Sequence, residues 1–356
     1  MITRAEVMSR LAPTPAVPTK TFVLEVHADS GIDYLRELAG PGNFEETADV
    51  YLHKVHANDD LVFWVDRLDS RFWNFHTQSN MRHAYPYLRG KVEDRRDLDW
   101  VWLPSDHLQN LWPRSVMRKV HAEFNAREFA DAESASSRLG VQLWGRGANN
   151  LLDYIAENPR YRSAVSYDSV EATLYDEDLG ITNEAINRRG RFAASGDSIE
   201  FHLQFVRMVV NRYRALVEAC ERRAITWTPF AQDGLDEGGH VDGGPIAIRF
   251  STPILDLQAF LEVIFSSRFP YRLWGVPELV DGVAHVEAVD LHVGHRTRID
   301  LGGTWMRVYL ERGGCGNTVA RLISNLQSSF DGALTLVDAE LQAALAAHRS
   351  AMHFGN

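Results

Sequence analysis

The spacing of short β-branched and aromatic runs constrains the fold most, because several of these runs follow one another with only a turn between them. Such runs occur at Val50–Val55, Leu61–Val65 and Phe72–Thr77, and again at Val283–Val293, Arg296–Asp300 and Thr304–Glu311. A parallel pair of strands needs a crossover of about a dozen residues or more, usually a helix. The spacing therefore predicts antiparallel sheets in an α+β protein and disfavours a Rossmann-like parallel sheet.

The order of the expected elements repeats along the chain. Residues 139–225 and 245–331 both give strand, helix, aromatic loop, further strands and helix, and residues 20–113 begin in the same way. We infer tandem helix-backed antiparallel-sheet units of the split βαβ type, with a long amphipathic helix in the second unit. Four other segments complete the expected organisation: an extended N-terminal arm at 1–19, a connecting helix at 114–138, a Gly- and Asp-rich linker at 226–244 and a C-terminal helix at 332–356.

Length and composition exclude several classes of protein. At about 150 residues per domain, the 356 residues have room for two or three domains, and the 45% of hydrophobic residues can fill their cores. The two cysteines are too few for a disulfide scaffold or for a zinc site with three or four thiolates. The net charge of −11 argues against a protein that coats nucleic acid through general attraction.

The N-terminal residues and the hydropathy pattern favour a cytoplasmic protein. Arg4, Glu6 and Arg10 lie where a secretory signal would need an unbroken apolar stretch. The longest apolar candidate, Ile246–Phe265, is interrupted by charged residues, whereas a membrane-spanning helix needs about 18 or more apolar residues. We expect a reducing, cytoplasmic location and no membrane partner.

A heptad pattern marks the longest expected helix, Ser198–Arg223. Its apolar positions are separated alternately by four and three residues: Ile199, Leu203, Val206, Val210, Tyr213, Val217 and Cys220. We interpret this as a helix that lies with one side across its own sheet. The alternative is a homodimer formed through residues 198–223.

Two glycine-rich turns join an expected strand to an expected helix. Glycine allows close approach of a ligand, and a helix start offers unpaired N–H groups, so both turns are candidate sites for a phosphate or carboxylate. The candidate anion-binding residues are Arg146 and Gly147 at the first turn, and Arg312, Gly314, Gly316 and Asn317 at the second. Neither turn matches a P-loop, and a tight turn followed by a helix cap is the alternative.

Three residues near the second turn are the catalytic candidates. Cys315 lies at an expected helix start, where the helix dipole and Arg312 would lower the pKa of its thiol. Asp290 and His292 share one face of an expected strand and form a candidate acid/base pair. The alternatives are a small residue in a tight turn for Cys315 and exposed strand side chains for the other two.

Aromatic and basic residues alternate at 67–83, a mixture that can stack bases and hold phosphates. The candidate nucleic-acid contacts are Arg67, Arg71, Trp73 and Arg82. A strand would turn one of the aromatic rows into the core. A second basic cluster, at 188–191, is interpreted as the solvated tip of a hairpin.

No metal site is predicted. The acidic glycine-rich stretch Asp233–Asp242 fits no calcium loop and is interpreted as a solvated linker. The sequence also contains no Gly-x-Ser-x-Gly, His-Glu-x-x-His, Cys-x-x-Cys, Walker A or kinase signature.

Two functions follow from these features. The first is a cytosolic binding or scaffold protein, with a nucleic-acid or protein partner on its aromatic-basic surface. The second is an enzyme that binds a phosphorylated or other anionic small molecule at a glycine-rich turn, and no cofactor is specified by either.

Overall fold

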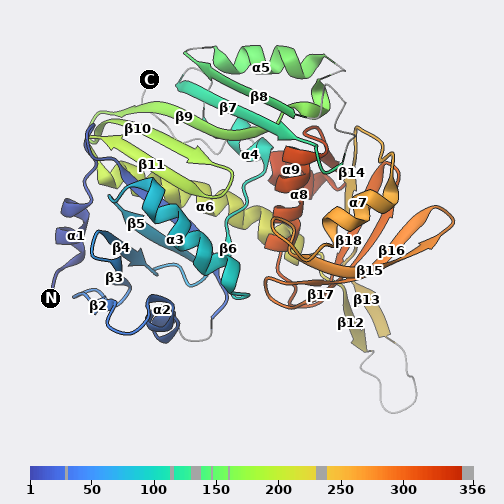
Figure 1. Ribbon diagram of the computed structural model, residues 1–356, viewed down its shortest axis with the longest axis horizontal. Coiled ribbons are helices and arrows are strands. Elements are labelled where there is room, and N and C mark those ends of the chain that lie inside the picture. Colours follow the sequence, from blue (N-terminus) through green and yellow to red (C-terminus); the bar gives the residue numbers. More distant parts are fainter. Residues whose placement is uncertain are drawn as a thin grey trace.

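Neighbouring strands pair antiparallel in the three sheets of the computed structural model, which confirms the expected α+β class. The structure describes residues 1–28, 31–112, 116–129, 138–145, 147–158, 161–229 and 239–346. Figure 1 shows the largest sheet on the left and upper part of the molecule and the second sheet on the right. Helix α8 lies between them.

The largest sheet combines strands from two of the units expected from the sequence. Its order is β2 (Phe44–Glu46), β3 (Leu52–Asn58), β4 (Leu61–Asp66), β5 (Phe72–Thr77), β1 (Thr19–Val26), β11 (Arg191–Gly196), β10 (Gly180–Asn187), β9 (Tyr167–Asp176), β7 (Met117–Asn125) and β8 (Arg138–Trp144), and β6 (Leu98–Trp100) also pairs with β1. Strand β1 joins the two halves because Phe22 pairs with Phe75 on one side and with Arg191 on the other.

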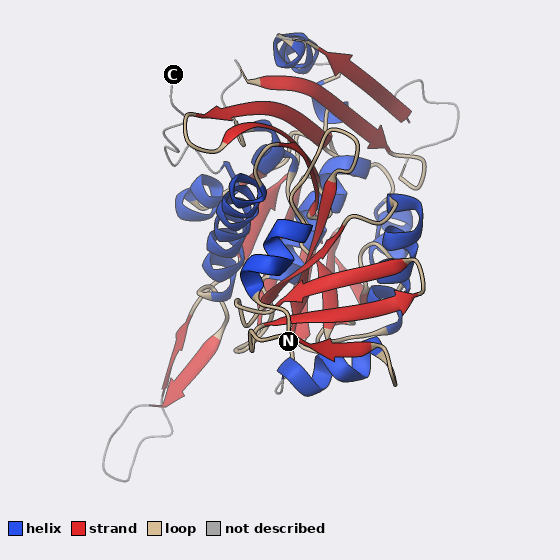
Figure 2. Cartoon of the chain, turned by 90° about the vertical axis from the view of Figure 1, so that its left-hand side faces the viewer, coloured by secondary structure: helices blue, strands red, loops and turns tan. Residues whose placement is uncertain are grey.

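The second sheet is formed by the C-terminal third of the chain. Its order is β15 (Leu273–Val280), β16 (Val283–Asp290), β17 (Arg296–Gly302), β18 (Trp305–Leu310), β14 (Ile246–Arg249) and β19 (Thr335–Leu336). A separate hairpin of β12 (Thr226–Pro229) and β13 (Gly239–Asp242) projects from the body of the molecule (Figure 2).

The described helices cover these sheets and fill the space between them. They are α1 (Arg4–Arg10), α2 (Gly31–Ala39), α3 (Met81–Asp94), α4 (Ser105–Gln109), α5 (Ala148–Glu157), α6 (Ile199–Glu221), α7 (Leu257–Ile264), α8 (Asn317–Ser329) and α9 (Ala339–Ala346), with a short 3₁₀ turn at Arg162–Ala164. No helix among the described residues is long and apolar enough to cross a membrane.

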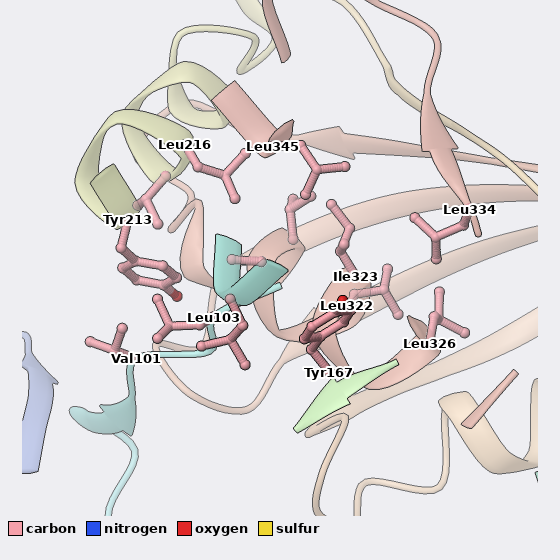
Figure 3. Packing of buried hydrophobic residues seen from close by; sticks show 14 of the residues in the cluster. Val101, Leu103, Tyr167, Tyr213, Leu216, Leu322, Ile323, Leu326, Leu334 and Leu345 are labelled. Carbon is pink, nitrogen blue, oxygen red and sulfur yellow. The ribbon is translucent and has the colours of Figure 1, made fainter. Parts of the chain in front are cut away.

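The main core lies where α6, α8 and α9 meet. Tyr213 and Leu216 of α6 pack in the same cluster as Leu322 and Ile323 of α8 and Leu345 of α9 (Figure 3). Most of the heptad side of α6 is buried in this way within the chain itself. Helix α8 is buried on all sides from Asn317 to Gln327, so its polar side chains require partners inside the protein.

Three expected segments differ from the structure. The arm at 1–19 contains α1, because Thr3 and Glu6 form a reciprocal capping box that starts a helix. The connecting helix at 114–138 is wrong over Met117–Asn125, which pairs with both β8 and β9; sheet pairing overrides helix propensity there.

The linker at 226–244 carries the β12–β13 hairpin on its two ends, and its acidic centre lies outside the described residues. The C-terminal helix is confirmed over α9, although a short strand, β19, precedes it.

Candidate metal centre

Two of the site's residues come from the central strand of the largest sheet. Glu25 is the last residue but one of β1 and His27 directly follows the strand, so the two lie at alternate positions and point to the same side. Glu25 is fully buried, between its sheet neighbours Phe72 and Asp99, whereas 34% of the His27 side chain is exposed. A buried glutamate in a central strand needs a charged or hydrogen-bonding partner.

The other two residues come from loops at the border with the second sheet. His292 follows the end of β16, and its N–H donates to Asp290 at 3.1 Å. Cys315 lies in the loop between β18 and α8, next to Gly316. A Cβ atom at Gly316 would overlap the main-chain carbonyl of Val217, so only glycine lets this loop pack against α6.

The ligand atoms of Glu25, His27, His292 and Cys315 all lie within 4.8 Å of one another. Cys315 Sγ is 3.5 Å from His27 Nε2 and 3.6 Å from Glu25 Oε2. Glu25 Oε1 is 3.4 Å from His27 Nε2, and Glu25 Oε2 is 3.4 Å from His292 Nε2. We call these four residues the Glu–His–His–Cys cluster.

Each of these four spacings is close to the edge length of a zinc tetrahedron, with His27 next to one oxygen of Glu25 and His292 next to the other. With bond lengths of about 2.1 Å to nitrogen or oxygen and about 2.3 Å to sulfur, nitrogen and oxygen ligands lie about 3.4 Å apart and sulfur lies about 3.6 Å from either. The observed distances agree with both values.

His292 is fully buried, yet neither of its ring nitrogens makes a hydrogen bond to any described residue. Its Nε2 faces Glu25, and its ring meets the ring of His27 edge-to-face at 5.2 Å between centroids. A buried imidazole without a hydrogen bond is unfavourable in isolation. Coordination of a metal ion by Nε2 would satisfy that nitrogen.

A shell of charged residues surrounds the cluster. Arg71 donates from Nε to Glu25 at 2.6 Å and from a terminal nitrogen to Glu221 at 2.6 Å. Glu221 also accepts the Gly316 N–H at 2.9 Å. These bonds connect Glu25 to the Cys315 loop through Arg71 and Glu221.

The pKa values of the two acidic groups are shifted in opposite directions. Burial raises the pKa of the Cys315 thiol well above its ordinary value, the charge of Glu25 adds to the effect, and Arg71 only partly opposes it. The expectation of a lowered thiol pKa is therefore wrong for the metal-free protein, in which Arg312 lies exposed. Burial alone would raise the pKa of Glu25, but His27, His292 and Arg71 outweigh it and bring that pKa well below its ordinary value.

The structure brings the three catalytic candidates to one place. His292 and Cys315 belong to the cluster, and Asp290 lies beside it. Asp290 accepts hydrogen bonds from Thr318 and from the buried Arg321, which also pairs with Asp99. Its carboxylate is therefore occupied in a buried ion-pair network that joins the two sheets.

The anion-binding candidates do not form one open site. At the second turn Gly314, Gly316 and Asn317 are buried, and the Gly316 N–H is already taken by Glu221. Gly147 precedes α5 in the left-handed conformation, with φ at +89°, and Arg146 lies outside the described residues.

The four nucleic-acid candidates are likewise separated. Trp73 is 2% exposed and packs in the core, and Arg71 belongs to the shell of the cluster. Arg67 stacks over Trp73 at 5.5 Å, whereas Arg82 is exposed on α3.

Sequence reasoning missed Glu25 and His27. The signal was a Glu-x-His pattern at the end of an apolar strand-like run, because alternate strand positions share a face. A charged residue in such a run indicates a buried partner, but the pattern does not say which distant residue supplies it.

Comparison with known proteins gives one family and one relative to report. The model of a protein family described as MJECL33-like protein matches residues 14–344. A curated protein of Methanocaldococcus jannaschii, described as uncharacterized protein MJECL33, is 23% identical over 366 residues, covering 91% of this chain and 86% of the relative. No solved structure matches the chain.

Proposed function

This chain belongs to the MJECL33-like protein family, and we propose that it is a zinc-binding protein whose metal ion is held by the Glu–His–His–Cys cluster. The observation that carries the proposal is the convergence of four ligand atoms within 4.8 Å of one another, with four contacts of 3.4–3.6 Å that are close to the edge lengths of a zinc tetrahedron. The fully buried His292, with no hydrogen bond to a described residue, supports it independently.

The charges of the cluster fit a divalent cation. A thiolate at Cys315 and the carboxylate of Glu25 together offset the two positive charges of zinc, and the imidazoles stay neutral. A coordinating thiol loses its proton to the metal, so the raised pKa in the metal-free protein does not prevent binding. Because the ligands must lose their protons before they bind the metal, binding is weaker at acidic pH.

The four-ligand arrangement supports a structural role for the metal. Glu25 lies at the end of β1, the central strand of the largest sheet, and His27 directly follows it, whereas His292 and Cys315 lie in loops of the C-terminal part. A bound ion would therefore join segments that are far apart in the chain and fix the border between the two sheets. Such a bond favours the native state because the site does not exist in the unfolded chain. This role suits a binding or scaffold protein.

Arg71 supports a second candidate, a metal-dependent hydrolase. Its Nε holds Glu25 at 2.6 Å, and if this keeps the carboxylate off the metal, three ligands remain. Three protein ligands with an open position are typical of catalytic zinc, and Glu25 would then act as a general base toward bound water. His27 is the exposed member of the cluster, whereas the other three residues are buried.

Metal analysis of the purified protein tests the proposal. We expect about one equivalent of zinc per chain and a loss of thermal stability on treatment with a chelator. Cys315→Ala should lose the zinc. The matched control is Cys220→Ala, which removes the other buried cysteine, a residue of α6 that is not a member of the cluster, and should keep the zinc. Equal zinc content in the two variants would refute the site.

Glu25→Gln distinguishes the two roles. If Glu25 is a ligand, the variant binds zinc more weakly than the parent protein, as judged by competition with a chromophoric chelator. If Glu25 is a base, the variant keeps its zinc and loses the hydrolysis of an activated ester measured for the parent protein. A parent protein that binds zinc tightly and hydrolyses no activated ester favours the structural role.

A further inference from the structure

The basic cluster at 188–191, expected as a solvated tip, turns inward to line a cavity. The turn between β10 and β11 faces Tyr271 and the C-terminal half of α8, and the cavity between them has a volume of about 530 Å³. Gly190 permits this path, because it has a φ of +62° and a Cβ there would lie 2.9 Å from the side chain of Val101. The volume is in the range of small-molecule sites.

The arginines of this cavity are incompletely neutralised. Arg188 lies 3.3 Å from Asp168 and donates to Asn325 at 2.9 Å. Arg189 and Arg191 have no carboxylate within 4 Å among the described residues. Arg189 donates to the Tyr85 hydroxyl at 2.5 Å, and Arg191 stacks over the same ring at 4.3 Å with its Nε buried and unpaired.

This arrangement disfavours the positive charges of Arg188 and Arg191. Burial lowers the pKa of Arg188, and the charge of Arg189 lowers it further. Burial likewise lowers the pKa of Arg191, with Arg189 contributing in the same direction. The carboxylates of Glu123, Glu128 and Asp168 also line the cavity. An anion beside Arg189 and Arg191 would provide the partner that the described residues do not supply.

An aromatic cavity adjoins the arginine cavity. Its volume is about 240 Å³, and it shares Arg189 and Pro270 with the larger one. The rings that line it are those of Tyr85, Trp100, Trp102 and Phe269; Trp100 and Trp102 are only 2% and 1% exposed, so Tyr85 and Phe269 are the rings open to a ligand. Aromatic side chains beside arginine form the usual surface for stacking a nucleobase.

From these two joined cavities we propose that the protein binds a nucleoside phosphate, with the phosphate at Arg189 and Arg191 and the base in the aromatic cavity. The shared chemistry is a phosphate ester next to a planar base, which a free nucleotide or the phosphorylated end of an oligonucleotide supplies. The site is separate from the metal cluster, because Asn317 and Asn325 lie about 12 Å apart along α8.

Isothermal titration of the full-length protein tests this proposal with AMP, GMP, CMP and UMP. The titrations contain Mg²⁺, because Glu123 and Asp168, which line this cavity, and His121 bring three ligand atoms within 4.8 Å of one another. We expect at least one nucleotide to bind, and to bind at least tenfold more tightly than its nucleoside or inorganic phosphate. A 5′-phosphorylated oligonucleotide, compared with the same oligonucleotide lacking the phosphate, identifies the source of the ligand.

Arg189→Gln and Arg191→Gln should each weaken binding at least tenfold. The matched control is Arg249→Gln, which neutralises an exposed arginine of β14 in the second sheet and should leave binding unchanged. Circular dichroism and thermal unfolding establish that each variant is folded. The proposal is overturned if neither a nucleotide nor the phosphorylated oligonucleotide binds, if phosphate alone binds as tightly, or if the control loses as much affinity as the two cavity variants.

Discussion

Replacement of Arg321 by methionine tests whether the buried ion-pair network holds the two sheets together. The Arg321 side chain is fully buried and pairs with Asp99 and Asp290, neither of which is more than 2% exposed. Methionine has no positive charge, so the buried carboxylates of Asp99 and Asp290 lose their shared cationic partner. Removal of one partner from a buried ion pair typically destabilises a protein by about 3–5 kcal/mol.

Contacts that remain in the variant place the expected loss of stability near the lower end of this range. Asp99 keeps hydrogen bonds from the Trp100 N–H at 2.8 Å and the Trp102 indole at 3.0 Å, and Arg272 stays 3.7 Å away. Asp290 keeps its hydrogen bond from Thr318. We therefore expect Arg321→Met to lower the free energy of unfolding by about 3 kcal/mol.

Urea unfolding followed by circular dichroism measures this change. The matched control is Arg222→Met, because Arg222 pairs with Glu340 at 2.8 Å while both side chains are about 60% exposed. Exposed pairs contribute about 0–1 kcal/mol, so the control should unfold almost like the parent protein. The reasoning is refuted if Arg321→Met loses less than about 1 kcal/mol, or no more than Arg222→Met.

Two further predictions concern other buried positions. Burial lowers the pKa of His107 to about 4, so as the pH falls the unfolded chain binds a proton at this residue before the folded protein does. The free energy of unfolding should therefore decrease by up to about 3 kcal/mol as the pH drops from about 6.5 to 4. Urea unfolding at pH 7 and pH 5 should show a smaller difference for His107→Gln than for the parent, and an unchanged difference would contradict the assignment. A Cβ at Gly316 would overlap the main-chain carbonyl of Val217, so Gly316→Ala should lose about 2 kcal/mol or more and bind zinc more weakly. A Cβ at Gly303 would meet no other atom within 4 Å, so Gly303→Ala should lower the free energy of unfolding by less than about 0.5 kcal/mol in the same assay. Equal losses of stability in the two variants would contradict the steric argument.

Local patterns were sufficient for part of the fold. The close spacing of strand-like runs indicates antiparallel pairing, and the heptad spacing identifies which side of α6 is buried. Local propensity failed at Met117–Asn125, which belongs to the Ala-, Glu- and Arg-rich stretch Ser115–Arg138 expected as a helix, because two neighbouring strands offer hydrogen bonds on both edges. A backbone that gains partners on both sides follows the sheet and not its propensity.

The candidate site was likewise predictable from the sequence only in part. Cys315 and His292 were recognisable from the sequence as reactive residue types near a turn. The only sequence signal for Glu25 and His27 was a charged residue within an apolar strand-like run. The basic residues at 188–191 were visible as a cluster, but their direction was not, and it is the packing of Gly190 on Val101 that turns them inward.

The sequence alone determined the α+β class, the buried side of its longest helix and the absence of the common catalytic motifs, because each depends on neighbours only a few positions apart. The tertiary structure alone decided that the end of β1 meets the Cys315 loop, and that the arginines of the 188–191 turn share a cavity with Tyr271 and α8. Side chains that are hundreds of positions apart meet only after the sheets and α8 have packed together. Burial then sets their charges and chemistry, and neither can be read from a local pattern.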